Sequence, residues 1–166
     1  MRILAIFSWA VVLWITKVFL FSLPYKFTLH PDTQHIFGVI GEWMQGIVGD
    51  TIGRSFAHYG AYVVGSVELI TSLVLLSPIV FWLLQKLMPV SRLPSRSHVH
   101  AVGGLMAAAV MGGAVFFHLF TPLGIVVLHE GKSDGGSLFT AAASILILGL
   151  FLFLANYGAN KKELKN

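Results

Sequence analysis

The chain has 166 residues, of which 56% are hydrophobic and 11% charged, with a formal net charge of +4 and no cysteine. A soluble domain has about 25% charged residues, so this chain lacks the polar surface of a water-soluble protein and is predicted to be an integral membrane protein. The absence of cysteine excludes disulfides, thiol relays, iron–sulfur clusters, cysteine-ligated zinc and covalently attached c-type haem.

Four stretches are long and apolar enough to cross a membrane, which takes about 20 residues for roughly 30 Å of hydrocarbon. They cover residues 3–23, 61–84, 101–120 and 138–157. Their continuous apolar character differs from the alternating segments of a membrane β-barrel. The sequence therefore predicts an all-α, four-helix membrane bundle that forms a single domain over residues 1–166.

The first stretch follows Arg2 and could also be a signal peptide, but no small-x-small cleavage site follows it. We therefore expect it to be retained as the first membrane helix. Lys and Arg residues in the short loops favour the cytoplasmic side. On one side lie Arg2, Lys86, Arg92, Arg96, Lys161, Lys162 and Lys165; on the other lie Lys26, Arg54 and Lys132. This bias predicts cytoplasmic termini in a bacterial inner membrane.

The basic excess is explained by cationic loops beside anionic lipid headgroups. No basic stripe with interleaved aromatic residues is present, so no nucleic-acid partner is expected. His98 and His100 in the cytoplasmic loop could form a metal pair, but a polar segment of this kind favours solvated imidazoles. We assign no metal site to the chain.

Residues 24–59 form the long outer loop, and their middle has a helical apolar period. The apolar positions are Ile36, Phe37, Val39, Ile40, Trp43, Met44 and Ile47. With Asp32 or Thr33 as the N-cap, this pattern predicts a short amphipathic helix. The helix either covers the mouth of the bundle or docks a partner.

The third stretch carries small residues in rows, with Gly104, Ala108 and Gly112 four apart and Gly103 and Ala107 likewise. Such rows let membrane helices approach closely, so this helix is expected to be central. After it, Asp134 and Ser137 enclose two glycines and predict a turn and cap that start the fourth helix.

Glu68 is the most informative residue, because a charge in a membrane helix costs about 2.5 to 3.5 kcal/mol on insertion scales. At about 1.5 Å per residue, Glu68, Lys17 and His118 all fall in the outer half of the bilayer. Small residues flank Glu68 and His118 at helical spacing, so both are expected to face the bundle interior. Lys17 either reaches Glu68 or extends outward to the headgroups.

Two interpretations of this polar centre stay open. It is either a buried network that fixes the helix arrangement, or a proton-exchanging or ligand-binding site for a polar head such as a quinone. In the second case Met111 and Phe117 would line an apolar pocket beside it. Haem or metal binding by histidines on the outer side is a further alternative, although His30 and His35 are five residues apart.

Several of these residues resemble the DoxX-like family of small four-helix membrane proteins. The similarity rests on Lys26-Phe27 after the first helix, on the segment from Gly65 to Leu69 around Glu68, and on a glycine-rich third helix that runs into His118. The resemblance implies that Lys26 is the family's basic residue, Glu68 its second-helix carboxylate and His118 a third-helix histidine of some members. The family is associated with membrane redox complexes, including a quinone-linked oxidoreductase subunit.

The sequence thus leads us to expect a subunit or partner of a quinone- or redox-linked membrane complex. Its partners would be membrane lipids and either another membrane protein or a second copy of the chain, and its one candidate cofactor is a quinone. A small-molecule or proton-coupled binding or transport protein is the first alternative. A lone enzyme is least favoured, because no nucleophile–base spacing or cofactor motif is evident.

Overall fold

The computed structural model describes residues 2–88 and 93–163, with side chains described as far as residue 159. Within these residues the chain forms α1 (Arg2–Phe27), α2 (Pro31–Val48), α3 (Asp50–Leu87), α4 (Arg96–Phe120) and α5 (Ser137–Glu163). A minimal antiparallel hairpin of β1 (Leu128–His129) and β2 (Lys132–Ser133) lies between α4 and α5.

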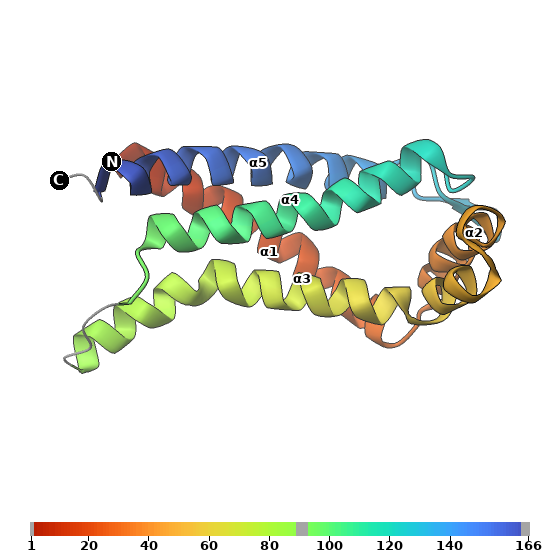
Figure 1. The fold of residues 1–166 in the computed structure, drawn as a ribbon, viewed down its shortest axis with the longest axis horizontal. Helices are drawn as coiled ribbons and strands as arrows, with labels where there is room; N and C mark the ends of the chain where they lie inside the picture. Colours follow the sequence, from red (N-terminus) through yellow and green to blue (C-terminus); the bar gives the residue numbers. More distant parts are fainter. Residues whose placement is uncertain (1, 89–92, 164–166) are drawn as a thin grey trace.

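Four of these helices are long and apolar enough to span a membrane: α1, α3, α4 and the Ser137–Ala159 part of α5. This confirms the predicted all-α four-helix class and an integral membrane protein. In Figure 1 the four helices run along one long axis, and α2 lies across one end. We call that end the α2 end, and the opposite end, where α3 finishes and α4 begins, the α3–α4 end.

The core consists of aliphatic and aromatic side chains from the spanning helices. Ile15 and Phe19 of α1, Leu75 of α3, and Ile145 and Leu152 of α5 are fully buried. Because lipid tails are as apolar as these side chains, close van der Waals packing rather than water exclusion holds such helices together.

The small residues of α4 pack against neighbouring helices of the same chain. A Cβ added to Gly104 would lie 2.8 Å from the carbonyl oxygen of Gly149, so α4 and α5 touch backbone to backbone. Gly103 is equally tight against Leu75 of α3. At Gly112 the nearest atom would be 3.8 Å away, so the expected close packing occurs only in the first half of the row.

The segment expected as a long outer loop, residues 24–59, is almost entirely helical. The first helix continues through Pro24 to Phe27, and α3 begins at Asp50 rather than near residue 61. The sequence boundaries were wrong here because residues 50–60 are too polar to count toward an apolar span, although nothing in them prevents a helix from starting earlier.

The amphipathic helix predicted in this segment is confirmed as α2, but its N-cap is His30 rather than Asp32 or Thr33. Pro31 occupies the first helical position, where its fixed φ suits a helix start, and the Nδ1 atom of His30 accepts from the backbone N–H of Asp32 at 3.3 Å. Only three residues separate α1 from α2, and the backbone N–H groups of Thr28 and His30 bond back to carbonyls of α1.

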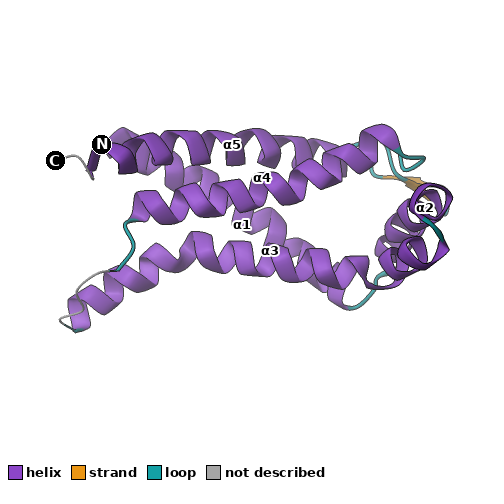
Figure 2. Ribbon diagram, viewed as in Figure 1, coloured by secondary structure: helices purple, strands orange, loops and turns teal. Residues whose placement is uncertain are grey.

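The α2 helix packs on the segment between α4 and α5, and Figure 2 shows the short strands beside it. Ile40 of α2 forms a small core with Leu123 and Val127. A hydrogen bond of 2.8 Å joins Asp32 to His129 Nδ1, and this bond lowers the pKa of the Asp32 carboxyl group. We call α2 and residues 121–136 together the cap.

Asp134 organises the return into α5, as the turn predicted there requires. Its carboxylate accepts from the backbone N–H groups of Val127, Gly136 and Leu138 at 2.7 to 3.0 Å. Burial acts to raise the pKa of Asp134, but these backbone hydrogen bonds outweigh it and the pKa is lowered.

Candidate functional site

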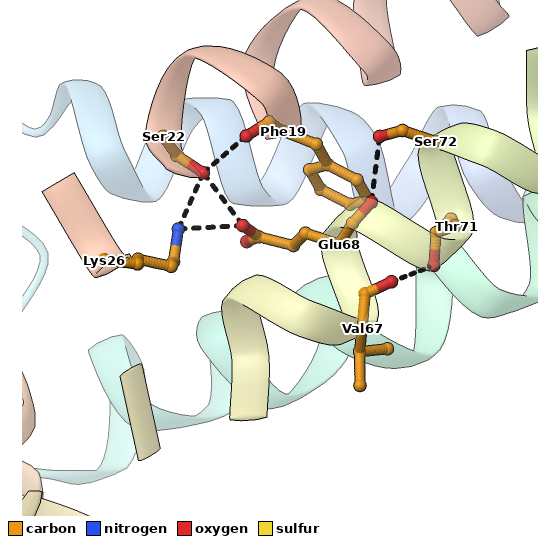
Figure 3. Close-up of polar contacts among 7 residues, drawn as sticks. All are labelled: Phe19, Ser22, Lys26, Val67, Glu68, Thr71 and Ser72. Atoms are coloured by element: carbon orange, nitrogen blue, oxygen red, sulfur yellow. Dashed lines mark hydrogen bonds and ion pairs between the residues drawn. The ribbon is translucent and has the colours of Figure 1, made fainter. Parts of the chain in front are cut away.

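A buried ion pair joins α1 to α3 near the α2 end. The Nζ atom of Lys26 lies 2.9 Å from Oε2 of Glu68, and the hydroxyl of Ser22 lies 2.8 Å from the same oxygen. Lys26 also donates to Ser22 Oγ at 2.7 Å. Figure 3 shows the three side chains closing a triangle between the two helices.

The local sequence explains why these groups meet. Ser22 and Lys26 are four residues apart and therefore share one face of α1. Gly65 lies one turn before Glu68 on α3, and a Cβ there would sit 3.3 Å from Cβ of Lys26. The missing side chain at Gly65 lets the lysine stem lie against α3, so that its ammonium group reaches the carboxylate.

Burial makes this pair energetically important. Glu68 is 2% exposed, and the side chain of Lys26 is 15% exposed. In such surroundings an unpaired carboxylate is strongly unfavourable, and pairing with hydrogen bonds offsets its desolvation. Together the two charges form a neutral unit within the bundle.

Ser22 has one hydroxyl proton and two acceptors for it. Its Oγ lies 2.7 Å from the carbonyl oxygen of Phe19 and 2.8 Å from Glu68 Oε2. When that proton points to Phe19, Lys26 remains as the donor to Glu68. By contrast, Thr71 and Ser72 donate to carbonyls of their own helix (Figure 3).

His118 and Glu68 do not form a common centre. The Nδ1 atom of His118 lies 2.7 Å from the carbonyl oxygen of Gly124, which makes Nδ1 the donor. The buried ring packs edge-on against Phe139 of α5, at a centroid distance of 5.8 Å. His118 therefore joins α4 to the cap and to α5, and the ion pair lies between α1 and α3. The expected centre failed because the depth arithmetic fixes height in the membrane but not the direction around each helix axis.

The other residues expected near the polar centre are also elsewhere. Lys17 is exposed on α1, with its ammonium group 5.9 Å from the ring centroid of Trp14, which matches the alternative in which it extends outward. Met111 belongs to the packed core, and Phe117 contacts the rings of Phe56 and Trp43 below the cap.

The pair of histidines expected in a solvated loop has a different position. Both His98 and His100 belong to α4, and His100 is completely buried with its ring edge-on to Trp9 at 4.8 Å. The loop was mispredicted because Ser95, whose side chain accepts from the N–H of His98, starts the helix five residues earlier than expected.

At the α2 end, the rings of His35 and His129 stack at 4.5 Å. Among the described residues, no group of three or more His, Asp or Glu side chains is placed to hold a metal ion.

Sequence reasoning missed a second polar contact inside the membrane part. The amide of Asn156 on α5 donates to Ser8 Oγ of α1 at 3.0 Å, and both residues are fully buried. The available signal was that Asn156 is the one amide side chain in the last apolar stretch. A membrane helix keeps such a group when it finds a partner on a neighbouring helix.

Two of the cavities bordered by the described residues lie away from the ion pair. One, of about 690 Å³, is at the α3–α4 end, and the other, of about 390 Å³, lies between α2 and the start of α3. Neither is lined by Glu68, Lys26 or His118.

No protein-family model, curated protein or solved structure matches this chain in the three comparisons.

Proposed function

We propose that the protein is a subunit or partner of a larger membrane complex, in which the cap and the helical hairpin that α2 forms with the start of α3 contact another protein. Gly49 is the one residue between these two helices. The proposal keeps the DoxX-like resemblance, and with it a quinone- or redox-linked complex in a bacterial inner membrane with both termini cytoplasmic. The observation that carries it is the exposed apolar tip of the hairpin.

The hairpin tip consists of Ile47, Val48 and Ile52, which are 63%, 48% and 54% exposed. The 38 residues of α3 correspond to about 57 Å of helix at 1.5 Å per residue, well beyond the roughly 30 Å of hydrocarbon. If residues 61–84 cross the membrane, the tip lies beyond the hydrocarbon, where exposed apolar groups favour a protein contact.

The buried ion pair supports a structural use of the membrane part. Lys26 pairs with Glu68 Oε2, the Ser22 hydroxyl lies within hydrogen-bonding distance of the same oxygen, and all three groups belong to one chain. The pair therefore fastens α1 to α3 without a ligand. The α4 glycines with the closest neighbours, Gly103 and Gly104, contact α3 and α5 of the same chain. They are therefore already used within the chain, and we place the contact with another protein at the cap and the hairpin tip.

The experiment is extraction of the native membrane in mild detergent, followed by native electrophoresis and mass identification of co-migrating proteins. Ile47→Ala combined with Ile52→Ala should release the protein from the larger particle. Leu73→Ala is the matched control, because Leu73 is an aliphatic residue of α3 that is 61% exposed, yet it lies within the spanning stretch. A wild-type protein that migrates only as a single chain would refute the proposal, as would a tip variant that stays in the particle.

A second candidate is binding or proton-coupled transport at Glu68, favoured by the burial of a carboxylate on a spanning helix. The test is Glu68→Gln, measured for both complex assembly and protection of the protein against heat by added ubiquinone. Protection of the wild type that disappears in the variant would favour this candidate. Loss of assembly without any protection by the quinone would favour the partner role.

A further inference from the structure

The larger cavity lies at the α3–α4 end, at the opposite end of the bundle from the cap. It has a volume of about 690 Å³ and is bordered by α1 through Trp9, by the last turns of α3, and by residues 93–96 at the start of α4. Cavities of roughly 300 to 1,000 Å³ are typical of small-molecule sites. The volume is therefore large enough for a polar headgroup.

A proline in α3 accounts for this opening. Pro78 cannot donate a hydrogen bond to the carbonyl of Val74, and the hydroxyl of Ser77 donates to that oxygen instead at 2.8 Å. Prolines of this kind kink membrane helices while nearby hydroxyls satisfy the freed carbonyls. Figure 1 shows the end of α3 leaving the other helices. The cavity lies where they part, with Pro78 in its wall.

The wall combines apolar rings with polar groups that carry no negative charge. Trp9, Phe81 and Trp82 contribute aromatic surface, and Gln85 and Arg96 contribute hydrogen-bond donors. The described lining contains no acidic residue. The ammonium group of Lys86 adds positive charge nearby, 4.2 Å from the ring centroid of Trp82.

Arg96 has a donor without an acceptor. Its Nη1 atom is completely buried and has no hydrogen-bond partner among the described residues. Guanidinium N–H groups donate only, and a buried donor that is left unsatisfied is costly. Arg96 borders the cavity, and guanidinium is well suited to phosphate, so turning of this side chain toward a bound anion would also give the buried donor an acceptor.

We propose that this cavity binds the phosphate headgroup of an anionic phospholipid, with Arg96 as the principal contact. Tryptophan side chains favour the level of the headgroups, and basic pockets between membrane helices suit acidic lipids. Ile79 and Trp82 are 46% and 54% exposed beside the cavity, so the acyl chains of such a lipid lie along the outer face of α3. The site is separate from the cap and from the Lys26–Glu68 pair.

The test compares phosphatidylglycerol with phosphatidylcholine on the delipidated protein in detergent, by native mass spectrometry and thermal unfolding. Phosphatidylglycerol should be retained at lower concentration and raise the melting temperature more than phosphatidylcholine. Arg96→Gln should weaken this retention about tenfold, as expected for loss of a hydrogen bond from a charged group. Arg96→Lys, which keeps the positive charge, should preserve more of the preference.

Arg54→Gln is the matched control, because Arg54 is an exposed arginine near the other end, paired with Asp50. It should bind phosphatidylglycerol like the wild type. If Arg96→Gln does not fold, the retention of the two lipids by the wild type is measured at increasing salt concentration instead. The preference for phosphatidylglycerol must weaken as the ionic strength rises, and a preference that does not change with salt overturns the proposal. Equal retention of the two lipids, or unchanged retention by a folded Arg96→Gln protein, overturns the proposal. Stabilisation by inorganic phosphate that matches phosphatidylglycerol also overturns it, by assigning the site to free phosphate.

Discussion

Removing one partner of the Lys26–Glu68 pair should be far more harmful than removing both. Lys26→Met leaves a carboxylate that is only 2% exposed, with the Ser22 hydroxyl as its remaining donor. Breaking a buried pair in this way lowers the free energy of unfolding by about 3 to 5 kcal/mol. We expect about 3 kcal/mol here, because Ser22 still donates. Glu68→Met should be milder, since the 15% exposed lysine can turn toward the headgroups.

The double variant Lys26→Met/Glu68→Met removes both charges and keeps similar side-chain volumes. Its stability should return to within about 1 kcal/mol of the wild type, giving a coupling energy of about 3 kcal/mol in a double-mutant cycle. The assay is reversible unfolding in mixed micelles with increasing denaturing detergent. Lys17→Met is the control on the same helix, because Lys17 is exposed. If Lys26→Met and Lys17→Met unfold alike, or if the double variant is as unstable as Lys26→Met, the pair does not stabilise the bundle.

Three further predictions concern packing, the cap and the second polar contact. Gly104→Ala should lower the melting temperature, since its Cβ would lie 2.8 Å from a backbone oxygen of α5 and such overpacking costs about 1 to 3 kcal/mol; Gly112→Ala, with its nearest neighbour at 3.8 Å, should not lower it. The lowered pKa of Asp134 means that its stabilising effect is complete above the ordinary value of 3.8 and is lost as the pH falls through the lower folded value. The protection of the amide hydrogens at the start of α5, measured relative to the intrinsic exchange rate at each pH, should therefore fall in acid, and Asp134→Ala should abolish that pH dependence of the protection; an unchanged protection profile in the variant would contradict it. Asn156→Leu should destabilise the protein by about 0.6 kcal/mol, the measured average for polar contacts between membrane helices, and by no more than about 1.7 kcal/mol, the measured maximum; equal unfolding of variant and wild type would show that the Ser8 contact contributes nothing.

The sequence was sufficient for the spanning helices because their signal is the length of an apolar run, which depends on the membrane and not on tertiary contacts. It was insufficient for the ends of those helices. The polar start of α3 at Asp50 and the start of α4 at Arg96 lie outside any apolar window. They are fixed by a short connection after α2 and by a serine cap.

For the polar centre, the sequence identified Glu68 as a charge in a membrane helix that needs a cationic or hydrogen-bonding partner. It did not determine which residue that partner is. Helical spacing gives the face of a residue relative to its own helix, whereas the rotation of one helix against another depends on packing across the whole bundle. Lys26 was identified through the family resemblance, and its contact with Glu68 depends on the space left by Gly65. His118 has its own acceptor at Gly124, which no pattern in α4 could reveal.

The short connection between α1 and α2 has a mechanical consequence. Lys26 is in the last turn of α1, and the backbone N–H groups of Thr28 and His30 tie the next residues to the same turn. The ion pair therefore holds the end of α1, and with it the start of α2, against α3. Any rotation of α1 that separated Lys26 from Glu68 would move α2 with it, so a change of charge at this buried pair would be transmitted as a movement at the protein surface.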